Sequence, residues 1–436
     1  MKRIKYLFLN SFVLRFTVHG KRSTFFFMLG CACQGIWVNR TKHIKKLVMI
    51  PWRIMRIGFL FNHETPHQVL HAAPTACELS RHYPGLEVIL ITSGPAVYNM
   101  VERVLSLYPD HSCQVVKARL PRAIHWLSQV VQPFILLQKR ARQVFNRHLF
   151  KSLDVLVTPE KTSLHLKRDP GLQHLVMIHT RHGVGDRAVG FDSRSGQFDL
   201  VLAAGPKVKQ RLVSKGSIEA DRCQVVGYPK FDVAPFLAEQ KSPFSNKKPI
   251  VLYNPHYSRQ ESSWPKMGRQ VLDIFCNNTK FNLIFAPHPI LYARTFRHKA
   301  RPLNRYQNKP NILLDTGSPA CSDMSYVLAA DIYLGDVSSQ VYEFLWRPRP
   351  CIFLDANRLI DHEPKENLRH WQAGQVLTDI DQLPAALDRV LVEPKAYIQQ
   401  QEILVQEAFD HDPNQSASVR AAEAIANFLG YRTKEC

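Results

Sequence analysis

A histidine beside a glycine-containing loop is the first group in the sequence that could carry out chemistry. His182 follows an apolar run that ends at His179, and Gly183 lets the backbone there approach a ligand closely. Because an imidazole titrates near neutral pH, His182 could take the proton of an attacking hydroxyl as a general base. Asp186 or Asp192 would then orient the ring. His179 is the alternative base, although its place in the apolar run favours a packed side chain.

A second histidine, His288, stands between Pro287 and Pro289 directly after another apolar run. Prolines restrict the backbone on both sides, which suits a ring that is presented in a fixed direction. Such a ring could donate a hydrogen bond to a phosphate oxygen or assist the departure of a leaving group. A loop histidine bonded to a neighbouring carbonyl group is the simpler interpretation, and it stays open.

The turn that contains Asp336, Ser338 and Ser339 is the clearest candidate for a phosphate site. It follows an apolar run and precedes a helix-like stretch that begins at Gln340. A serine hydroxyl, the free amide groups of the first turn and the helix dipole would all face an anion there. Glu343, one turn later, would reach ribose hydroxyls or only favour the start of the helix. An ordinary serine cap without a ligand is the competing interpretation.

Two further loops lie at either end of the expected interdomain linker. Tyr228 belongs to a Gly-Tyr-Pro turn just before the linker and would line a cleft. His256 and Arg259 follow the first apolar run after it and are candidates for contacts with a phosphate or a base. A solvated loop is the default interpretation of that pair. No spacing of cysteines and histidines in the sequence indicates a metal site, so we expect metal-independent chemistry.

Short apolar, β-branched runs alternate with helix-like stretches, which is typical of parallel α/β units. In the first half they predict strands at residues 56–61, 87–92, 113–118, 155–159, 175–179, 200–204 and 224–227. In the second half they predict strands at residues 250–254, 283–286, 312–315, 331–334, 352–355 and 376–378. We therefore expect an α/β fold class with two Rossmann-like, doubly wound domains. Ligands of such sheets bind beyond the carboxyl ends of the strands, which is where the candidate residues lie.

Composition divides the chain further. Residues 236–249 lose the periodicity and gain Pro, Lys, Ser and Asn, which indicates a linker. The expected parts are an extension over residues 1–54, a first domain over 55–235, the linker, a second domain over 250–394 and a helical segment over 395–436. Apolar contacts of that last segment are expected from Leu404, Ala408, Ala421, Ala424, Ile425 and Phe428.

The formal net charge of +21 is unevenly distributed. Residues 1–55 contain eleven Lys and Arg and no acid, which indicates an over-extended reading frame or a peripheral basic anchor. Residues 111–153 contain eight more, again without an acid, next to aliphatic and aromatic side chains. This tract is expected either to contact an anionic membrane surface or to be a helix that covers the sheet with a solvated basic side.

Other classes of protein are disfavoured by the sequence. Nucleic acid is not an expected partner, since there is no zinc-finger spacing, no RNP-type aromatic strand and no helix-turn-helix pattern. The nine cysteines are scattered and odd in number, which is typical of a reducing compartment and not of a disulfide framework. We therefore expect a cytoplasmic location.

The order of these motifs resembles that of the CDP-glycerol glycerophosphotransferase family of teichoic-acid polymerases. The shared order is His-Gly at His182, the Gly-Tyr-Pro-x-x-Asp exit at Tyr228, a polar turn at His256, His-Pro at His288 and Asp-x-Ser-Ser at Ser338. The resemblance implies a fold of the glycosyltransferase-B type, with two Rossmann-like domains facing across a cleft. The first domain would bind the acceptor and the second the donor nucleotide.

The resemblance also implies a function. It points to an enzyme, peripheral to the inner face of the cell membrane, that transfers glycerol phosphate from CDP-glycerol to a hydroxyl of a cell-surface polymer or a lipid-linked acceptor. By matching motif, His182 would be the general base, His288 the donor-phosphate histidine, and Ser338 with Ser339 the diphosphate cradle. No cofactor is implied beyond the nucleotide-activated donor.

The sequence departs from the family pattern around the first histidine. Where the family has Trp-His-Gly-Thr-Pro-Leu-Lys, this chain has Arg181, His182, Gly183 and then Val-Gly-Asp-Arg. Another CDP-alditol or a sugar donor is thus an alternative to CDP-glycerol. A nucleotide-sugar glycosyltransferase or UDP-sugar 2-epimerase on the same fold is a second alternative. A non-catalytic, membrane-associated binding protein is a third, from another class.

Overall fold

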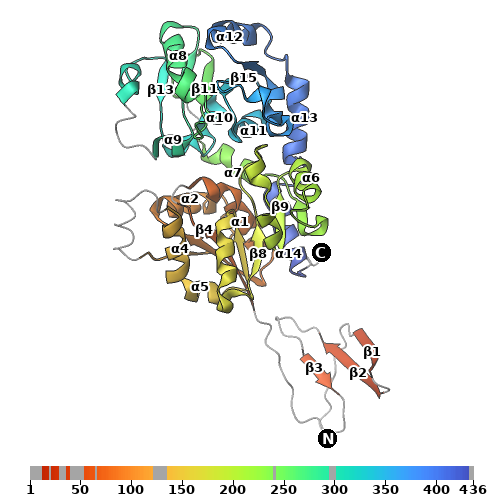
Figure 1. Cartoon of the computed structure of the whole chain (residues 1–436). Helices are drawn as coiled ribbons and strands as arrows, with labels where there is room; N and C mark the ends of the chain where they lie inside the picture. Colours follow the sequence, from red (N-terminus) through yellow and green to blue (C-terminus); the bar gives the residue numbers. More distant parts are fainter. Residues whose placement is uncertain are drawn as a thin grey trace. The chain divides into compact units, whose positions relative to one another are not determined.

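The computed structural model describes residues 12–18, 21–28, 36–39, 54–63, 66–120, 135–238, 242–293 and 301–431. The chain forms two compact units, Met1–Met55 and Arg56–Cys436 (Figure 1). In the first unit β1 (Phe12–Val18), β2 (Lys21–Met28) and β3 (Ile36–Asn39) pair in an antiparallel sheet. The sequence pattern predicts no strand in this basic segment, so these three strands were missed.

The second unit contains two parallel sheets flanked by helices, and we call the parts around them the first lobe and the second lobe (Figure 1). The first sheet has the order β10-β9-β8-β7-β4-β5-β6. Its strands are β4 (Met55–Phe61), β5 (Leu86–Thr92), β6 (Gln114–Lys117), β7 (Val155–Thr158), β8 (Val176–His179), β9 (Leu200–Ala203) and β10 (Cys223–Val225). The strand order reverses between β4 and β7, which makes their carboxyl ends the point where doubly wound sheets bind ligands.

Helices of the first lobe connect these strands. They include η1 (Pro66–His71), α1 (Ala73–His82), α2 (Pro95–Leu105), α4 (Ile135–Phe145), α5 (Arg147–Lys151), η3 (Lys161–Arg168), α6 (Pro206–Ser214) and, after the last strand, α7 (Lys230–Leu237). Strands β7 and β9 are buried at every position, as expected for strands covered on both faces. The apolar side chains of this sheet form one core cluster with those of α5, η3 and α6.

The second sheet has the order β13-β12-β11-β14-β15-β16. Its strands are β11 (Ile250–Asn254), β12 (Asn282–Phe285), β13 (Ile312–Leu314), β14 (Ile332–Gly335), β15 (Cys351–Leu354) and β16 (Gln375–Leu377). Its helices include α8 (Trp264–Asn277), α9 (Pro289–Ala293), α10 (Ser325–Ala329), α11 (Gln340–Leu345), η13 (Arg369–Ala373) and α12 (Leu383–Val392). The order reverses between β11 and β14, so the second ligand-binding edge lies at the ends of these two strands.

Two carboxyl-terminal helices connect the lobes. Helix α13 (Ile398–Phe409) contacts η13 and α11 of the second lobe and also α6 of the first. Helix α14 (Ala417–Phe428) then packs on α1 in the first lobe. One apolar cluster contains Val184 and Tyr228 of the first lobe together with Tyr342, Phe344 and Phe409 beyond the linker. The lobes therefore share part of their hydrophobic core.

The predicted fold class is confirmed. Each predicted strand of the second unit is present, with its ends shifted by no more than a few residues. The predicted carboxyl-terminal helices are present, and Leu404, Ala408, Ala421 and Ile425 are buried as expected. Phe428 is not, because it is 43% exposed at the end of α14. Within the described part of the chain, no helix is both long and apolar enough to cross a membrane.

Candidate active site

The predicted general base lies directly beyond strand β8. The backbone turns sharply after Thr180, since Arg181 has a φ of 53° and Gly183 a φ of 75°. These left-handed conformations lift His182 out of the line of the strand, and the residue is exposed. His179 itself is buried, with its Nδ1 bonded to the carbonyl of Thr158. His179 is therefore the packed residue of the pair, as expected.

The protonation pattern of His182 follows from one hydrogen bond. Its Nδ1 lies 2.7 Å from the carbonyl oxygen of Pro159. Because a carbonyl can only accept, Nδ1 carries the hydrogen and Nε2 keeps its lone pair. Surrounding protein atoms displace water from the ring, and this desolvation lowers the pKa of His182. The hydrogen bond to Pro159 and the charge of Glu160 oppose the effect but are smaller. A neutral ring with a free lone pair on Nε2 is what a general base needs.

The turn before α11 contacts the loop that carries His182. A Cβ on Gly183 would lie 3.3 Å from Oγ of Ser339, and one on Gly185 would lie 3.1 Å from its Cβ. Ser339 is nevertheless exposed, whereas Ser338 is buried and its Oγ accepts a hydrogen bond from the amide of Gln340 at 3.2 Å. Ser338 therefore binds the first amide of α11, and Ser339 is the exposed serine at the N-cap position. Because Gly183 and Gly185 have no Cβ, the two lobes can approach each other closely at this point.

Asp336 does not face a phosphate site. It is 1% exposed, and its carboxylate accepts hydrogen bonds from the amide of His256 at 2.8 Å and from Ser263 Oγ at 2.9 Å. Burial raises the pKa of Asp336 to about 7. Its role is to fix the loop after β11 against the loop after β14. The prediction that Asp336 contacts the donor phosphates is therefore wrong for this conformation.

His256 belongs to a buried contact between the lobes. An amino group of Arg187 lies 3.2 Å from its Nε2, and the backbone amide of Ser258 donates to its Nδ1 at 3.1 Å. Glu261 lies 3.2 Å from Nδ1 of His256 and 2.7 Å from Nε of Arg187. Burial lowers the pKa of His256, against the opposing bond to Glu261. Arg259, the other predicted contact of this loop, is exposed.

His288 lies after β12 and close to His256. Its ring centre is 5.9 Å from that of His256 and 4.8 Å from that of Tyr257. Its backbone amide donates to the carbonyl of Pro255 at 3.0 Å, which fixes the loop between the two prolines. Burial, together with the nearby charges of His256 and Arg187, lowers the pKa of His288 to about 3. The ring is therefore neutral near pH 7.

Asp186 does not orient His182. Its carboxylate is buried and accepts from Nζ of Lys207 at 2.8 Å, from the hydroxyl of Tyr342 at 2.7 Å and from the amide of His370 at 3.1 Å. Asp192, the alternative, pairs with Lys161 at 2.9 Å. The predicted orienting role is wrong because the carbonyl of Pro159 fulfils it.

Glu343 is also engaged between the lobes. Nζ of Lys230 lies 2.7 Å from one of its oxygens, and the hydroxyl of Tyr228 donates to the other at 2.9 Å. The side chains of Lys230 and Glu343 are only 4% and 9% exposed. The carboxylate is not available to ribose hydroxyls in this conformation, so that predicted contact is absent. Tyr228 likewise supports the lobe contact and is 5% exposed.

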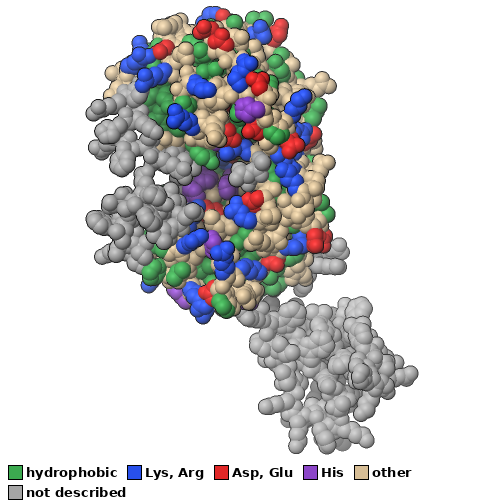
Figure 2. All heavy atoms as spheres, viewed as in Figure 1, with side chains coloured by type: hydrophobic (Ala, Val, Ile, Leu, Met, Phe, Trp, Pro, Cys, Tyr) green, Lys and Arg blue, Asp and Glu red, His purple; other side chains and the backbone are tan. Residues whose placement is uncertain are grey.

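Three histidines beyond strand β4 were missed by the sequence reasoning. His63, His67 and His71 follow one another at intervals of four residues, and η1 carries the last two. The rings of His67 and His71 lie 6.0 and 6.4 Å from that of His182. Figure 2 shows histidine side chains gathered in a hollow between the lobes. The regular spacing directly after the first strand was the signal that could have found them.

A buried ion pair lies behind the His182 ring. Nζ of Lys139 in α4 is 2.5 Å from Oε1 of Glu160, the residue that follows Pro159. Burial alone would raise the pKa of Glu160, but the charge and hydrogen bond of Lys139 outweigh it and lower the pKa. The pair is therefore neutral as a whole and adds no net charge beside His182.

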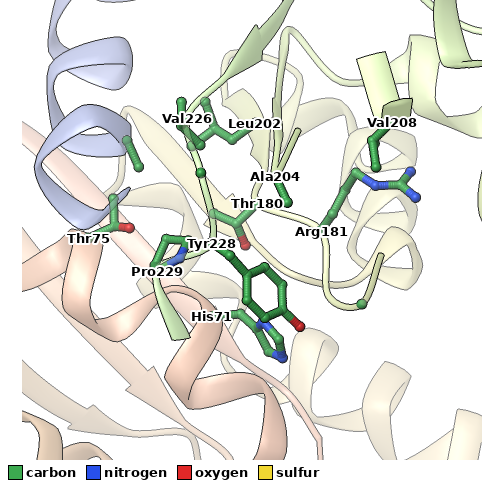
Figure 3. A pocket seen from close by; sticks show the side chains of 13 residues that line it. His71, Thr75, Thr180, Arg181, Leu202, Ala204, Val208, Val226, Tyr228 and Pro229 are labelled. Atoms are coloured by element: carbon green, nitrogen blue, oxygen red, sulfur yellow. The ribbon is translucent and has the colours of Figure 1, made fainter. Parts of the chain in front are cut away.

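Two cavities adjoin Tyr228, and neither is lined by His182, His288 or Ser339. The first has a volume of about 10 Å³, roughly the space for one water molecule. His71 and Tyr228 lie side by side on its wall, and the hydroxyls of Thr75 and Thr180 on it have no partner among the described residues (Figure 3). The second, of about 130 Å³, lies between α7, α13 and the start of α14. The candidate site is thus the open hollow and not an enclosed pocket.

Chemically, the hollow combines a neutral base with several hydrogen-bond donors for an anion. In the described part of the chain no three His, Cys, Asp or Glu side chains are placed to hold a metal ion. The arrangement suits transfer of a phosphoryl group to a hydroxyl, in which positioning and charge stabilisation provide most of the catalysis.

Comparison with known proteins identifies the family. Residues 111–427, well over half of the chain, match the family described as CDP-glycerol:poly(glycerophosphate) glycerophosphotransferase. The chain belongs to this family. The match includes the loops of His182 and His288 and the turn before α11, so the resemblance predicted from the motifs is confirmed. The comparison with curated proteins found no match.

Solved structures of the same fold support this result. A histidine variant of the wall teichoic acid polymerase TagF superposes with a TM-score of 0.59 at 11% identity, covering 86% of this chain and 89% of that one. TagF soaked with CDPG gives a TM-score of 0.58 at 13% identity over 87% and 90% of the two chains. The S. aureus MnaA–UDP structure gives 0.56 at 15% identity over 88% and 99%. These likenesses establish the two-lobed fold of the glycosyltransferase-B type.

Family membership decides among the alternatives left open by the sequence. The enzyme is a transferase of the glycerophosphotransferase type. Nucleotide-sugar glycosyl transfer, sugar epimerisation and a non-catalytic binding role are not favoured, because the matching family is defined by glycerophosphate transfer.

Proposed function

We propose that this glycerophosphotransferase moves a glycerol-phosphate unit from CDP-glycerol to a hydroxyl of a surface polymer or a lipid-linked acceptor. The observation that carries the proposal is the state of His182. Its Nδ1 is fixed on the carbonyl of Pro159 and its Nε2 is free to accept a proton at an exposed position. The family match supports CDP-glycerol as the donor.

In the proposed mechanism Nε2 of His182 removes the proton of the acceptor hydroxyl. The hydroxyl oxygen attacks the phosphorus next to glycerol, and the bond from that phosphorus to the bridging oxygen of CMP breaks. Negative charge grows on the phosphoryl oxygens and on the departing CMP. The neutral ring of His288 in the second lobe and the guanidinium of Arg187 in the first lobe support this charge.

The donor diphosphate is proposed to bind where Ser339 is exposed beside Gly183 and Gly185, before the start of α11. The hydroxyl of Ser339 would contact its oxygens without a metal ion. Ser338 acts indirectly, because its buried hydroxyl already accepts the amide of Gln340. No cofactor is required by this mechanism beyond the activated donor.

The acceptor side is proposed to lie near a membrane surface. In α4 the polar Arg142 and Gln143 are buried, while Val144 and Phe145 are 68% and 49% exposed. Exposed cationic residues, Arg140 and Lys151, flank these apolar side chains. Such a surface suits an anionic leaflet, so we propose a peripheral location at the cytoplasmic face of the membrane. Residues 121–134 of the basic tract lie outside the described residues.

Radiolabelled donors test the proposed reaction. Purified protein is incubated with membranes and with labelled CDP-glycerol, UDP-sugar or CMP-sugar, and transfer to membrane material is counted. We expect transfer from CDP-glycerol, a loss of about 10²- to 10⁴-fold in His182→Ala, and an unchanged rate in His362→Ala, an exposed histidine of the second lobe. Transfer from a sugar nucleotide alone would contradict the donor. Full activity of both His182→Ala and His288→Ala would contradict the site.

A further inference from the structure

The proposed base belongs to a loop whose two ends are bonded to each other. Residues 181–190 follow β8, and we call them the His182 loop. A terminal nitrogen of the Arg181 guanidinium donates to the carbonyl of Gly190 at 2.9 Å. This bond joins the first residue of the loop to the last. It therefore closes the segment that carries His182 and the interlobe residues Asp186 and Arg187.

The turn after β7 holds the same loop at two points. The carbonyl of Pro159 accepts the hydrogen bond of His182 Nδ1 at 2.7 Å. Two residues later, Nζ of Lys161 donates to the carbonyl of Gly190 at 3.2 Å. Gly190 is thus bonded to both Lys161 and Arg181, and the side chain next to Arg181 is bonded to Pro159. The three bonds form a closed frame around the backbone that presents His182.

The ring of Phe191 supports the guanidinium in this frame. The guanidinium carbon of Arg181 lies 5.1 Å from the ring centre of Phe191, and that of Arg211 lies 4.3 Å from it. Both are cation–π contacts, and the ring is only 3% exposed. Arg211 also donates to the carbonyl of Asp186 and, at 2.8 Å, to Asn367 of the second lobe. In Figure 3 the Arg181 side chain extends away from Tyr228.

Arg181 adopts this arrangement at a cost. Its φ of 53° is a left-handed conformation that side chains with a Cβ rarely adopt. Burial lowers the pKa of its guanidinium to about 10, and its Nε has no hydrogen-bond partner among the described residues. The nearby carboxylate of Asp192 pairs with Lys161 and Arg194 instead. Backbone strain that the surrounding contacts maintain is typical of segments on which function depends.

We propose that Arg181 is a positioning residue for His182, whose guanidinium closes the His182 loop and so keeps the lone pair of Nε2 in a fixed direction. The inference rests on the proposed function and adds one residue to it. Arg181 acts through the backbone and not on the substrate. Its guanidinium stays protonated during the reaction, and the acceptor proton goes to Nε2 of His182.

Kinetics and hydrogen exchange of Arg181→Met test the proposal. Methionine keeps the Cβ, and with it the backbone strain, but it removes the charge and the N–H donors. We expect kcat to fall by about tenfold to a hundredfold, because a small displacement of a catalytic group is enough for such a loss. KM for CDP-glycerol should change little, because His288 and Ser339 belong to the other lobe. Amide hydrogen exchange of the His182 loop should become faster, since the loop opens more easily.

Two further variants make the result specific. Arg181→Lys still offers a charged donor to the carbonyl of Gly190 and should recover part of kcat. Arg222→Met is the matched control. Arg222 is another half-buried arginine of the first lobe, and it donates to the carbonyls of Gly196 at 3.1 Å and Asp199 at 3.3 Å. Its loss should lower the melting temperature but leave kcat and the exchange of the His182 loop unchanged.

The outcomes separate this inference from the proposed function. An unchanged kcat in Arg181→Met would overturn the inference, and so would unchanged exchange of the His182 loop or an equal loss of kcat in Arg222→Met. If the wild type transferred only from a sugar nucleotide, the proposed donor would be wrong, and the same comparison with that donor would still decide the role of Arg181. If Arg181→Met lacks a cooperative melting transition, Phe191→Leu, which removes the ring beside the guanidinium, decides through the same two measurements.

Discussion

Replacing Asp186 with asparagine distinguishes a structural role of this residue from an orienting role toward His182. Its carboxylate connects Lys207 of α6 with Tyr342 of α11 and His370 of η13, and so joins the two lobes. The variant keeps the shape of the side chain but removes its charge. Lys207 would then remain buried without its counter-ion, because its side chain is only 5% exposed.

The expected magnitude follows from the burial of the pair. The Asp186 side chain is 1% exposed, so both charges are largely removed from water. Removing one partner of such a pair costs about 3–5 kcal/mol. We expect Asp186→Asn to lower the free energy of unfolding by about this amount. Lys207→Met in the same chain should recover much of the loss, because neutral replacements of a whole buried pair are often tolerated.

The pH dependence adds a second signature. Burial alone would raise the pKa of Asp186, but the bond to His370 and the charge of Lys207 outweigh it and hold the pKa well below the usual carboxyl range. The stabilisation is therefore complete above the unfolded-state pKa of about 4 and is lost as the pH falls toward the lower folded-state value. The difference in stability between wild type and Asp186→Asn should shrink over that acidic range.

Urea unfolding and the pH profile of the transfer rate together decide the question. We expect a large loss of stability, a rate per folded molecule within about tenfold of the wild type, and a pH profile of the same shape. A catalytic carboxylate that orients a histidine base can contribute on the order of 10⁴-fold to the rate. A loss of that size with unchanged stability would refute the structural role and restore the orienting one.

Three further predictions concern the base, the second lobe contact and the membrane. In the wild type the transfer rate should begin to fall only at pH values below the usual pKa range of an imidazole, because the pKa of His182 is lowered and its neutral form persists to more acidic pH. A steady-state pH profile with a midpoint above 7 would contradict this. Glu343→Gln should lower the free energy of unfolding by about 3–5 kcal/mol, since Lys230 is left buried without a partner; thermal unfolding measures this, and Lys230→Met in the same chain is the control. The double variant Val144→Ser with Phe145→Ser should bind anionic vesicles tenfold or more weakly in a sedimentation assay, since burial of each apolar side chain contributes about 1.5–3 kcal/mol. Its melting temperature should stay unchanged. Equal recovery of wild type and variant with the vesicles would remove α4 from the membrane contact.

The strands were predictable because their signal is local. Strand β11 (Ile250–Asn254) was predicted with its observed bounds, and it is buried at every position. A run of β-branched and apolar residues bounded by polar turns is enough to mark such a strand. The order of the strands follows from the rules for parallel α/β units, so the loops that carry His182 and His288 could be placed at the ligand-binding edge.

The acidic residues were not predictable in the same way. Asp186, Asp336 and Glu343 each stand next to a predicted phosphate or base residue in sequence, which made them candidates. Their partners come from distant parts of the chain, as with Tyr342, 156 residues beyond Asp186. Sequence neighbourhood shows which loop a carboxylate belongs to, but long-range packing decides which way it points. His63 was missed because it belongs to no motif of the family.

The contacts of Asp186 and Arg187 have a consequence for how the enzyme positions its base. These residues belong to the same loop as His182, and they bond to Tyr342, His256 and Glu261 of the second lobe. Any separation of the lobes must therefore break these bonds or move the backbone that carries the base. Because His288 and the turn before α11 belong to the lobe that would move, the base, the donor histidine and the phosphate turn reach their relative positions only when the lobes are in contact.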